Sequence, residues 1–218
     1  MFDRTPPARA PDGKLSLVTT RLELREAPRH RRVSMTGRDV ALVHAQRPPL
    51  HFYRYLYATV GAPYLWWERR EMDDAALGSI IFDDRVEIHV LLVDGVPAGF
   101  AELDRRRAGE VELAYFGLMP EFIGQGLGLP LLDRVVEQAW QADGVERVTV
   151  HYCSTDHPRA LQVYQRIGFV PYDEVRAMID DPRDRGLFPE HMIDTQLGVT
   201  ASNDAGTPSD DMHEPEPG

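Results

Sequence analysis

The segment that most restricts the fold runs from Leu118 to Gly128 and reads LMPEFIGQGLG. It follows an apolar stretch, residues 111–118, and precedes an amphipathic helix that we expect to end near Gln141. Glycines allow a backbone to adopt positive φ and to approach a ligand closely. A strand, a glycine-rich turn and a helix in this order therefore predict a ligand site at the start of the helix.

A phosphate group is the ligand that such a turn favours. The first N–H groups of a helix have no intrahelical partner and carry about half a positive charge, so they attract anions. The dinucleotide spacing G-x-G-x-x-G fails, because its last position is Leu129 counted from Gly124 and Leu131 counted from Gly126. No Gly-Lys-Ser/Thr follows, which also excludes a P-loop. A turn that only changes the direction of the chain remains the alternative.

The flanking sequence predicts a sheet with helices on it. Asp94-Gly95 lies between two alternating apolar stretches and predicts a hairpin. Asp73 or Asp74 is expected to cap a helix. The order of elements predicts an α+β fold with a mixed, mostly antiparallel central sheet flanked by helices. The expected strands cover residues 18–26, 39–45, 86–93, 96–103, 111–118, 147–153 and 169–179, and the other expected helices cover 52–57 and 158–167.

Periodicity also predicts which helix faces are buried. The helix after the glycine-rich turn repeats apolar side chains at four-residue spacing, with charged and amide side chains between them. Its expected buried residues are Leu127, Leu131, Leu132, Val135, Val136 and Ala139, and its expected wet residues are Asp133, Arg134, Glu137 and Gln138. In the helix capped by Asp73 or Asp74, the expected inner residues are Ala76, Leu77 and Ile80.

Composition sets the domain boundaries and excludes several classes. Residues 1–14 and 196–218 are poor in apolar side chains, and we expect a disordered N-terminus and a disordered acidic tail. Residues 15–195 suffice for one domain. The net charge of -11 argues against a nucleic-acid binder. A single cysteine, the lack of a secretory signal and the lack of a long apolar run predict a cytoplasmic protein without a membrane partner.

Two motifs together make the chain similar to a known family. The strand VELAYFGL and the segment DHPRALQVYQRIGF flank the glycine-rich turn and its helix. With them, residues 86–179 resemble the GNAT superfamily of N-acetyltransferases. Its members carry Gln/Arg-x-x-Gly-x-Gly/Ala after the fourth strand and a helix that ends in Tyr-x-x-x-Gly-Phe. Gly126 and Gly128 fill the small positions of the first motif, and Tyr164, Gly168 and Phe169 match the second.

The resemblance implies a fold and a co-substrate. The fourth and fifth strands of the family, here 111–118 and 147–153, splay apart, and acetyl-CoA binds in the cleft between them. Ile123 stands where the family has Arg or Gln, so backbone N–H groups would carry more of the pyrophosphate contact. His157 stands where many members have Asn. The implied cofactor-binding residues are Leu118, Met119, Gly124, Gln125, Gly126, Leu127, Gly128 and His157.

The resemblance also implies the catalytic groups. Glu112 matches a position where several members hold the general base, and partial burial would raise its pKa. Glu110 and His151 are competing candidates, and a solvent-facing or arginine-paired Glu112 is the alternative. Tyr164 matches the general acid that protonates the departing thiolate, although it also lies on an apolar helix face. The reaction would be direct attack in a ternary complex.

The sequence does not identify the acceptor substrate. Aromatic residues at 51–57 and 64–68 fall where the family forms its acceptor wall, and Tyr57, Trp66 and His151 are the candidate substrate-binding residues, with core packing as the alternative. Ligand spacing does not support a metal site. We expect an N-acetyltransferase for a primary amine of a small molecule or peptide, compatible with a homodimer. A non-catalytic acyl-CoA-binding or sensory module is the alternative, and a longer acyl donor or an oxygen acceptor stays open.

Overall fold

The structure is a computed structural model that describes residues 9–28 and 39–188. The expected disordered tail, residues 196–218, and residues 1–8 of the expected disordered N-terminus lie outside these residues, as do residues 189–195 of the expected domain. Seven strands form one sheet: β1 (Lys14–Leu24), β2 (Val40–His44), β3 (Val86–Val93), β4 (Val96–Asp104), β5 (Glu110–Leu118), β6 (Arg147–Cys153) and β7 (Val170–Asp180). The helices are α1 (Leu50–Gly61), α2 (Glu68–Glu71), α3 (Asp74–Ile81), α4 (Gly128–Trp140) and α5 (Ala160–Ile167), with 3₁₀ turns at Ala62–Tyr64, Pro120–Phe122 and Pro182–Arg185.

The sheet is mixed, as the sequence predicts. Its strand order is β2-β3-β4-β5-β6-β1-β7, and every neighbouring pair is antiparallel except β5 and β6. The turn between β3 and β4 has φ of 51° at Asp94 and 79° at Gly95. Positive φ at both positions is the geometry of a tight hairpin, so the predicted turn is confirmed.

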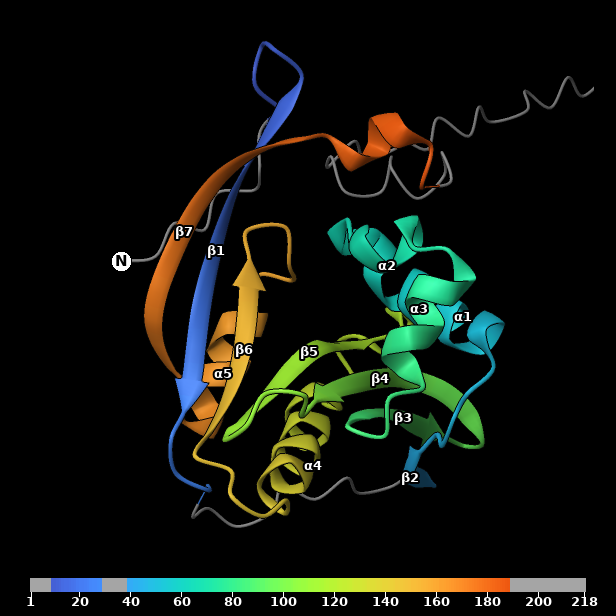
Figure 1. The fold of residues 1–218 in the computed structure, drawn as a ribbon, viewed down its shortest axis with the longest axis vertical. Coiled ribbons are helices and arrows are strands. Elements are labelled where there is room, and N and C mark those ends of the chain that lie inside the picture. Colours follow the sequence, from blue (N-terminus) through green and yellow to red (C-terminus); the bar gives the residue numbers. More distant parts are fainter. Residues whose placement is uncertain (1–8, 29–38, 189–218) are drawn as a thin grey trace, which may run out of the picture.

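The splayed strands are confirmed as well. β5 and β6 pair only from Glu110 opposite Arg147 to Leu113 opposite Val150. Beyond these pairs the two strands separate, and Figure 1 shows β5 turning away from β6. A β-bulge at Ala114 contributes to the turn, because Glu102 of β4 pairs with Tyr115 whereas Leu103 pairs with Leu113.

β1 takes a place that its sequence does not reveal. It lies between β6 and β7, with Arg21 opposite both His151 and Asp173. The strand that the sequence predicts over residues 18–26 is therefore present, and it begins at Lys14, four residues before the predicted start. Without β1, the outer edge of β6 would lack a hydrogen-bonded neighbour within the described sheet.

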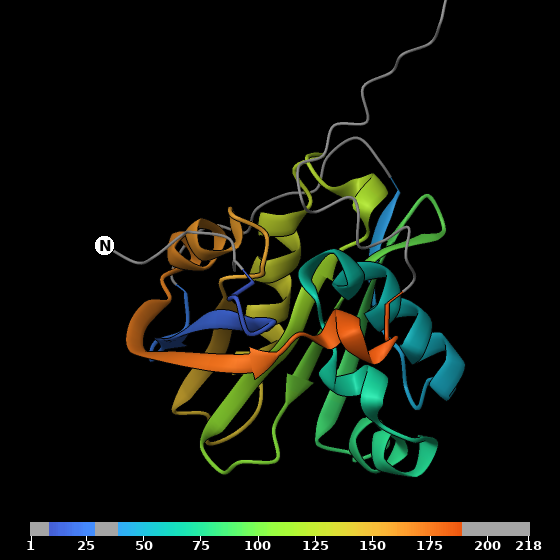
Figure 2. The same cartoon turned by 90° about the horizontal axis from the view of Figure 1, so that it is seen from above.

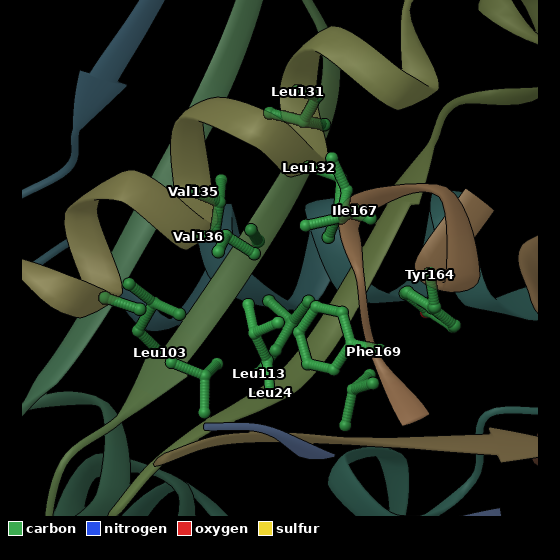
Figure 3. Close-up of a cluster of buried hydrophobic side chains, with 14 of the residues drawn as sticks. Leu24, Leu103, Leu113, Leu131, Leu132, Val135, Val136, Tyr164, Ile167 and Phe169 are labelled. Atoms are coloured by element: carbon green, nitrogen blue, oxygen red, sulfur yellow. The ribbon is translucent and has the colours of Figure 1, made fainter. Parts of the chain in front are cut away.

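Helices cover both faces of the sheet and bury two apolar clusters. α4 and α5 lie on one face, and α1, α2 and α3 lie on the other (Figures 1 and 2). The first cluster joins α4 and α5 to the strands and includes Leu131, Val135, Ile167 and Phe169 (Figure 3). The second joins α1 and α3 to β3 and β4 and includes Phe100. The cavity described below lies where these two layers meet the splayed strands.

One expectation about a helix cap and two about burial have clear outcomes. Asp73 caps α3, since its side chain accepts a hydrogen bond from the N–H of Ala76. Ala76 itself is exposed, so its predicted inner position is wrong. Asp133 is 7% exposed, so its place on the wet face of α4 is also wrong. α4 packs against α5 as well as against the sheet, and the covered part of the helix is therefore wider than one apolar stripe.

Candidate active site

The separation of β5 and β6 opens a cavity of about 800 Å³. Its lining comes from both strands, from β1, from residues 64–69, from the glycine-rich turn and from the starts of α4 and α5. These elements meet only in the folded chain. A volume of this size is typical of a small-molecule or cofactor site.

Most of the predicted site residues line this cavity, and three do not. Those that line it are Glu112, Leu118, Gly124, Gly126, Leu127, Gly128, Trp66, His151, His157 and Tyr164. Met119 is buried, and its N–H donates to the carbonyl of Ala98. The side-chain amide of Gln125 donates to the carbonyl of Glu121. Tyr57 is 2% exposed and packs behind Trp66, with ring centroids 5.5 Å apart.

The glycine-rich turn has the geometry of an anion cradle. Gly124 has φ of 83° and Gly126 has φ of 78°, and a Cβ placed on either would meet nothing within 4 Å. α4 begins at Gly128 without a side-chain cap and without an acidic residue in its first turn. The exposed N–H groups of the turn and the positive end of α4 therefore fit a phosphate group.

Tyr164 lies beside the same cavity on α5. Its ring packs between Phe116 and Phe169, each at a centroid distance of 6.1 Å. Burial raises its pKa, and the nearby Asp156 and Cys153 add to the rise. The phenol thus keeps its proton at neutral pH and can donate a hydrogen bond to an anion such as a thiolate.

Glu112 and His151 form a pair at the base of the splay. His151 Nδ1 lies 3.2 Å from Glu112 Oε1, with the two side chains 43% and 22% exposed. The expected raised pKa of Glu112 is wrong. The hydrogen bond with His151 lowers the pKa of Glu112 against the opposing effect of burial. Glu110 is occupied elsewhere, since Arg147 Nη2 lies 2.6 Å from its Oε2.

Asp156 is a cavity residue whose role the sequence does not show. Its Oδ2 accepts a hydrogen bond from the N–H of Cys153 at 2.7 Å, and its Oδ1 accepts from Trp66 Nε1 at 3.4 Å. Burial raises its pKa to about 6 despite these two donors. Because Asp156 follows β6 and Trp66 follows α1, their contact spans the opening between the splayed strands.

A buried ionic network supports the cavity on the side of α1 and α2. Glu102 is 0% exposed and accepts hydrogen bonds from Tyr53 and from Arg69, the latter at 2.8 Å. The Arg69 guanidinium also lies 5.2 Å from the ring centroid of Tyr115. Sequence reasoning missed this network, although a glutamate within the apolar run of β4 was a signal. The network fixes one wall of the cavity, where Arg69 and Tyr115 both lie.

Metal sites and membrane-spanning helices are the two other features considered for the described residues of this chain. Among residues 9–28 and 39–188, no group of three or more His, Cys, Asp or Glu side chains is placed to hold a metal ion. The helices of the same residues include none with the length and apolar character needed to cross a membrane.

Comparisons with known proteins identify the family. Two solved structures have similar folds. A GCN5-related N-acetyltransferase from Kribbella flavida is 19% identical over 74% of this chain and 57% of that one, with a TM-score of 0.50. A GCN5-related N-acetyltransferase from Sphaerobacter thermophilus is 16% identical over 75% of this chain and 50% of that one, with a TM-score of 0.52. This chain thus spans 57% and 50% of the lengths of these two proteins. The model of the acetyltransferase (GNAT) family matches residues 51–169, more than half of the 218 residues, and the chain belongs to that family.

Proposed function

We propose that this protein transfers the acetyl group of acetyl-CoA to a primary amine by direct attack in a ternary complex. The observation that carries the proposal is the cavity between β5 and β6. It brings together an uncapped helix start, a buried phenol and a carboxylate–imidazole pair. An anion site, an acid and a base are the groups that amine acetylation requires.

The cavity fits the proposed co-substrate along its length. Gly126, Leu127 and Gly128 would hold the pyrophosphate through backbone N–H groups, which suits the presence of apolar Ile123 at the turn. Leu118 lies on the part of β5 that has no β6 partner. Its free backbone edge would pair with the extended pantetheine arm. When bound, acetyl-CoA supplies the acetyl group and a thiolate leaving group.

The residues of this chain then carry out two proton transfers. The Glu112–His151 pair takes a proton from the acceptor ammonium, because only a neutral amine can attack a carbonyl carbon. Tyr164 donates its proton to the departing sulfur. Trp66 lines the acceptor side, where its indole packs against Tyr115 at a centroid distance of 5.0 Å, so an apolar part of the acceptor would lie on it.

The proposal is tested first by calorimetric titration with acetyl-CoA and with CoA. We expect micromolar binding by the wild type and its loss in Gly128→Glu. A carboxylate there repels the pyrophosphate but favours the helix, and the added Cβ would meet Leu118 Cδ1 at an ordinary 3.9 Å. Gly128→Ala serves as the control for size. Failure of the wild type to bind either compound would refute the proposal.

A second pair of variants uses the turn itself. Gly126→Glu places a charge at φ of 78°, and Gly144→Glu places the same charge at φ of 74° outside the cavity. Both substitutions strain the backbone, so only a loss of binding confined to Gly126→Glu supports the site. Acetyl transfer to a panel of amines is then measured by release of free thiol. Tight acetyl-CoA binding without transfer to any amine would favour a non-catalytic acyl-CoA-binding module.

A further inference from the structure

We infer that His151 is the group that removes the proton from the acceptor amine, and that Glu112 is a positioning residue that orients its ring. The inference rests on the proposed function and divides the work of the Glu112–His151 pair. The sequence resemblance implies the reverse assignment, with Glu112 as the base. Three features of the structure support His151.

The first feature is the geometry of the pair. His151 Nδ1 faces Glu112 Oε1 at 3.2 Å. A carboxylate only accepts hydrogen bonds, so Nδ1 must carry the hydrogen and Nε2 must carry the lone pair. A carboxylate that fixes the tautomer of an imidazole in this way is the arrangement of base and orienter in acyl transfer.

The second feature is the state of the carboxylate. The hydrogen bond with His151 lowers the pKa of Glu112, so its charged form is favoured and its affinity for a further proton is reduced. Histidine is the side chain that most often serves as a general base. His151 is also the more exposed side chain of the two. The acceptor amine can therefore reach the imidazole more easily than the carboxylate.

The third feature is a second, polar cavity of about 170 Å³ on which both residues also lie. Its other lining residues are Arg21, Arg107, Glu110, Thr149 and Tyr172. This volume holds a few water molecules. The pair thus lies between two cavities. Acetyl transfer would take place in the larger cavity, and the proton removed from the acceptor would leave to water in the smaller one.

The arginines and acidic residues on the strands beside His151 are paired with one another. Arg21 of β1 lies directly opposite His151 in the strand register, and its guanidinium pairs with Asp173 of β7 at 3.1 Å. On the β5 side, Glu110 is paired with Arg147 and with Arg107. Glu112 is thus the anion that faces the ring directly.

The proton and electron balance is complete. The acceptor ammonium gives a proton to His151 Nε2, and the freed nitrogen lone pair attacks the thioester carbonyl carbon. The carbon–sulfur bond breaks, and the sulfur leaves with its electron pair and takes the hydroxyl proton of Tyr164. The phenolate recovers a proton from the newly acylated nitrogen. The imidazolium releases its proton to water, so one proton is produced per amide formed.

The test uses the full chain with acetyl-CoA and three acceptors: spermidine, kanamycin and a dipeptide with a free N-terminus. On the best acceptor we expect His151→Ala to lose at least 100-fold in kcat with an unchanged KM for acetyl-CoA, and added imidazole to restore activity. In Glu112→Gln the rate should still fall on the acid side of the pH–rate profile, but this fall should occur at lower pH than in the wild type. His51→Ala, an exposed site outside the cavity, is the matched control.

Two results would overturn the assignment while leaving acetyl transfer intact. One is a His151→Ala variant that keeps its rate and its acid limb while Glu112→Gln loses both. The other is an imidazole nitrogen spectrum of ¹⁵N-labelled protein in which Nε2, rather than Nδ1, carries the hydrogen. If the wild type acetylates none of the three amines, the proposed transfer and this inference both fail.

Discussion

At the scale of single residues, Asp156 couples the cavity to the stability of the fold. Burial raises its pKa from 3.8 to about 6. Between these two values the folded protein binds more protons than the unfolded chain, so this group makes the protein less stable as pH rises. The contribution is complete near pH 6 and amounts to roughly 3 kcal/mol.

Asp156→Asn should remove this dependence. The free energy of unfolding of the variant, minus that of the wild type, is expected to increase between pH 4 and pH 6 and then to level off. Urea denaturation at several pH values measures this difference, in which the contributions of other groups cancel. A difference that stays constant over the range would contradict the assigned pKa.

The site contains some residues that the sequence predicts and one pairing that it does not. Tyr164 and the glycines of the turn could be found because their motif is local. The pairing of Glu112 with His151 joins two strands, and neither neighbourhood contains a sign of it. The hydrogen bond with His151, a partner that the sequence does not reveal, lowers the pKa of Glu112 by more than burial by itself raises it.

At the scale of elements, two glycines leave the space in which Trp66 packs between α1 and β5. A Cβ on Gly61 of α1 would lie 2.4 Å from Trp66 Cε3, and a Cβ on Gly117 of β5 would lie 2.5 Å from Val60 Cγ1 and 3.8 Å from Trp66 Cη2. Real side chains do not approach so closely. The missing side chains therefore allow α1, β5 and the indole to pack together at the acceptor wall.

Gly117→Ala should destabilise the protein by about 1–3 kcal/mol through overpacking. Val60→Ala removes the clashing methyl group and costs on the order of 2 kcal/mol by itself. The double variant should cost at least about 1 kcal/mol less than the sum of the two single variants. Thermal and urea denaturation of the four proteins measure this coupling. Additive losses would show that Val60 is not the obstacle.

Most element boundaries follow from local patterns. Residues 86–93 alternate and end at Asp-Gly, and β3 covers the predicted range. Strand β6 also matches its predicted range. The four-residue helix α2 escaped prediction because ERRE contains no apolar periodicity. Its position is set by contacts with α1, since Arg70 donates to the carbonyl of Ala58 in α1.

At the scale of the whole molecule, β1 holds the two halves of the C-terminal region together. It is hydrogen-bonded to β6 on one edge and β7 on the other. No local property of residues 14–24 specifies these partners, because pairing over such a distance depends on the rest of the sheet. The position of β1 in the sheet was therefore beyond prediction, although its strand character was not.

Leu22→Ala should cost about 2–5 kcal/mol, because the side chain is 0% exposed within the larger apolar cluster. Val170→Ala on the neighbouring β7, where the side chain is 62% exposed, should change stability by less than about 0.5 kcal/mol. In both variants, tryptophan fluorescence and far-ultraviolet circular dichroism should report the same midpoint. Separate midpoints would show that β1 and β7 unfold independently of the helical layers.

The position of β1 also sets an order of events during protein synthesis. Residues 14–24 leave the ribosome long before their two partner strands, which end at Cys153 and Asp180. At about 5–20 residues per second, roughly ten to thirty seconds separate the appearance of β1 from that of β7. Until β6 appears, β1 lacks a partner on both of its edges, so the nascent chain depends on whatever shields them. Because β1 supplies part of the cavity lining, the site is completed only when this strand has met partners that are synthesised more than 120 residues after it.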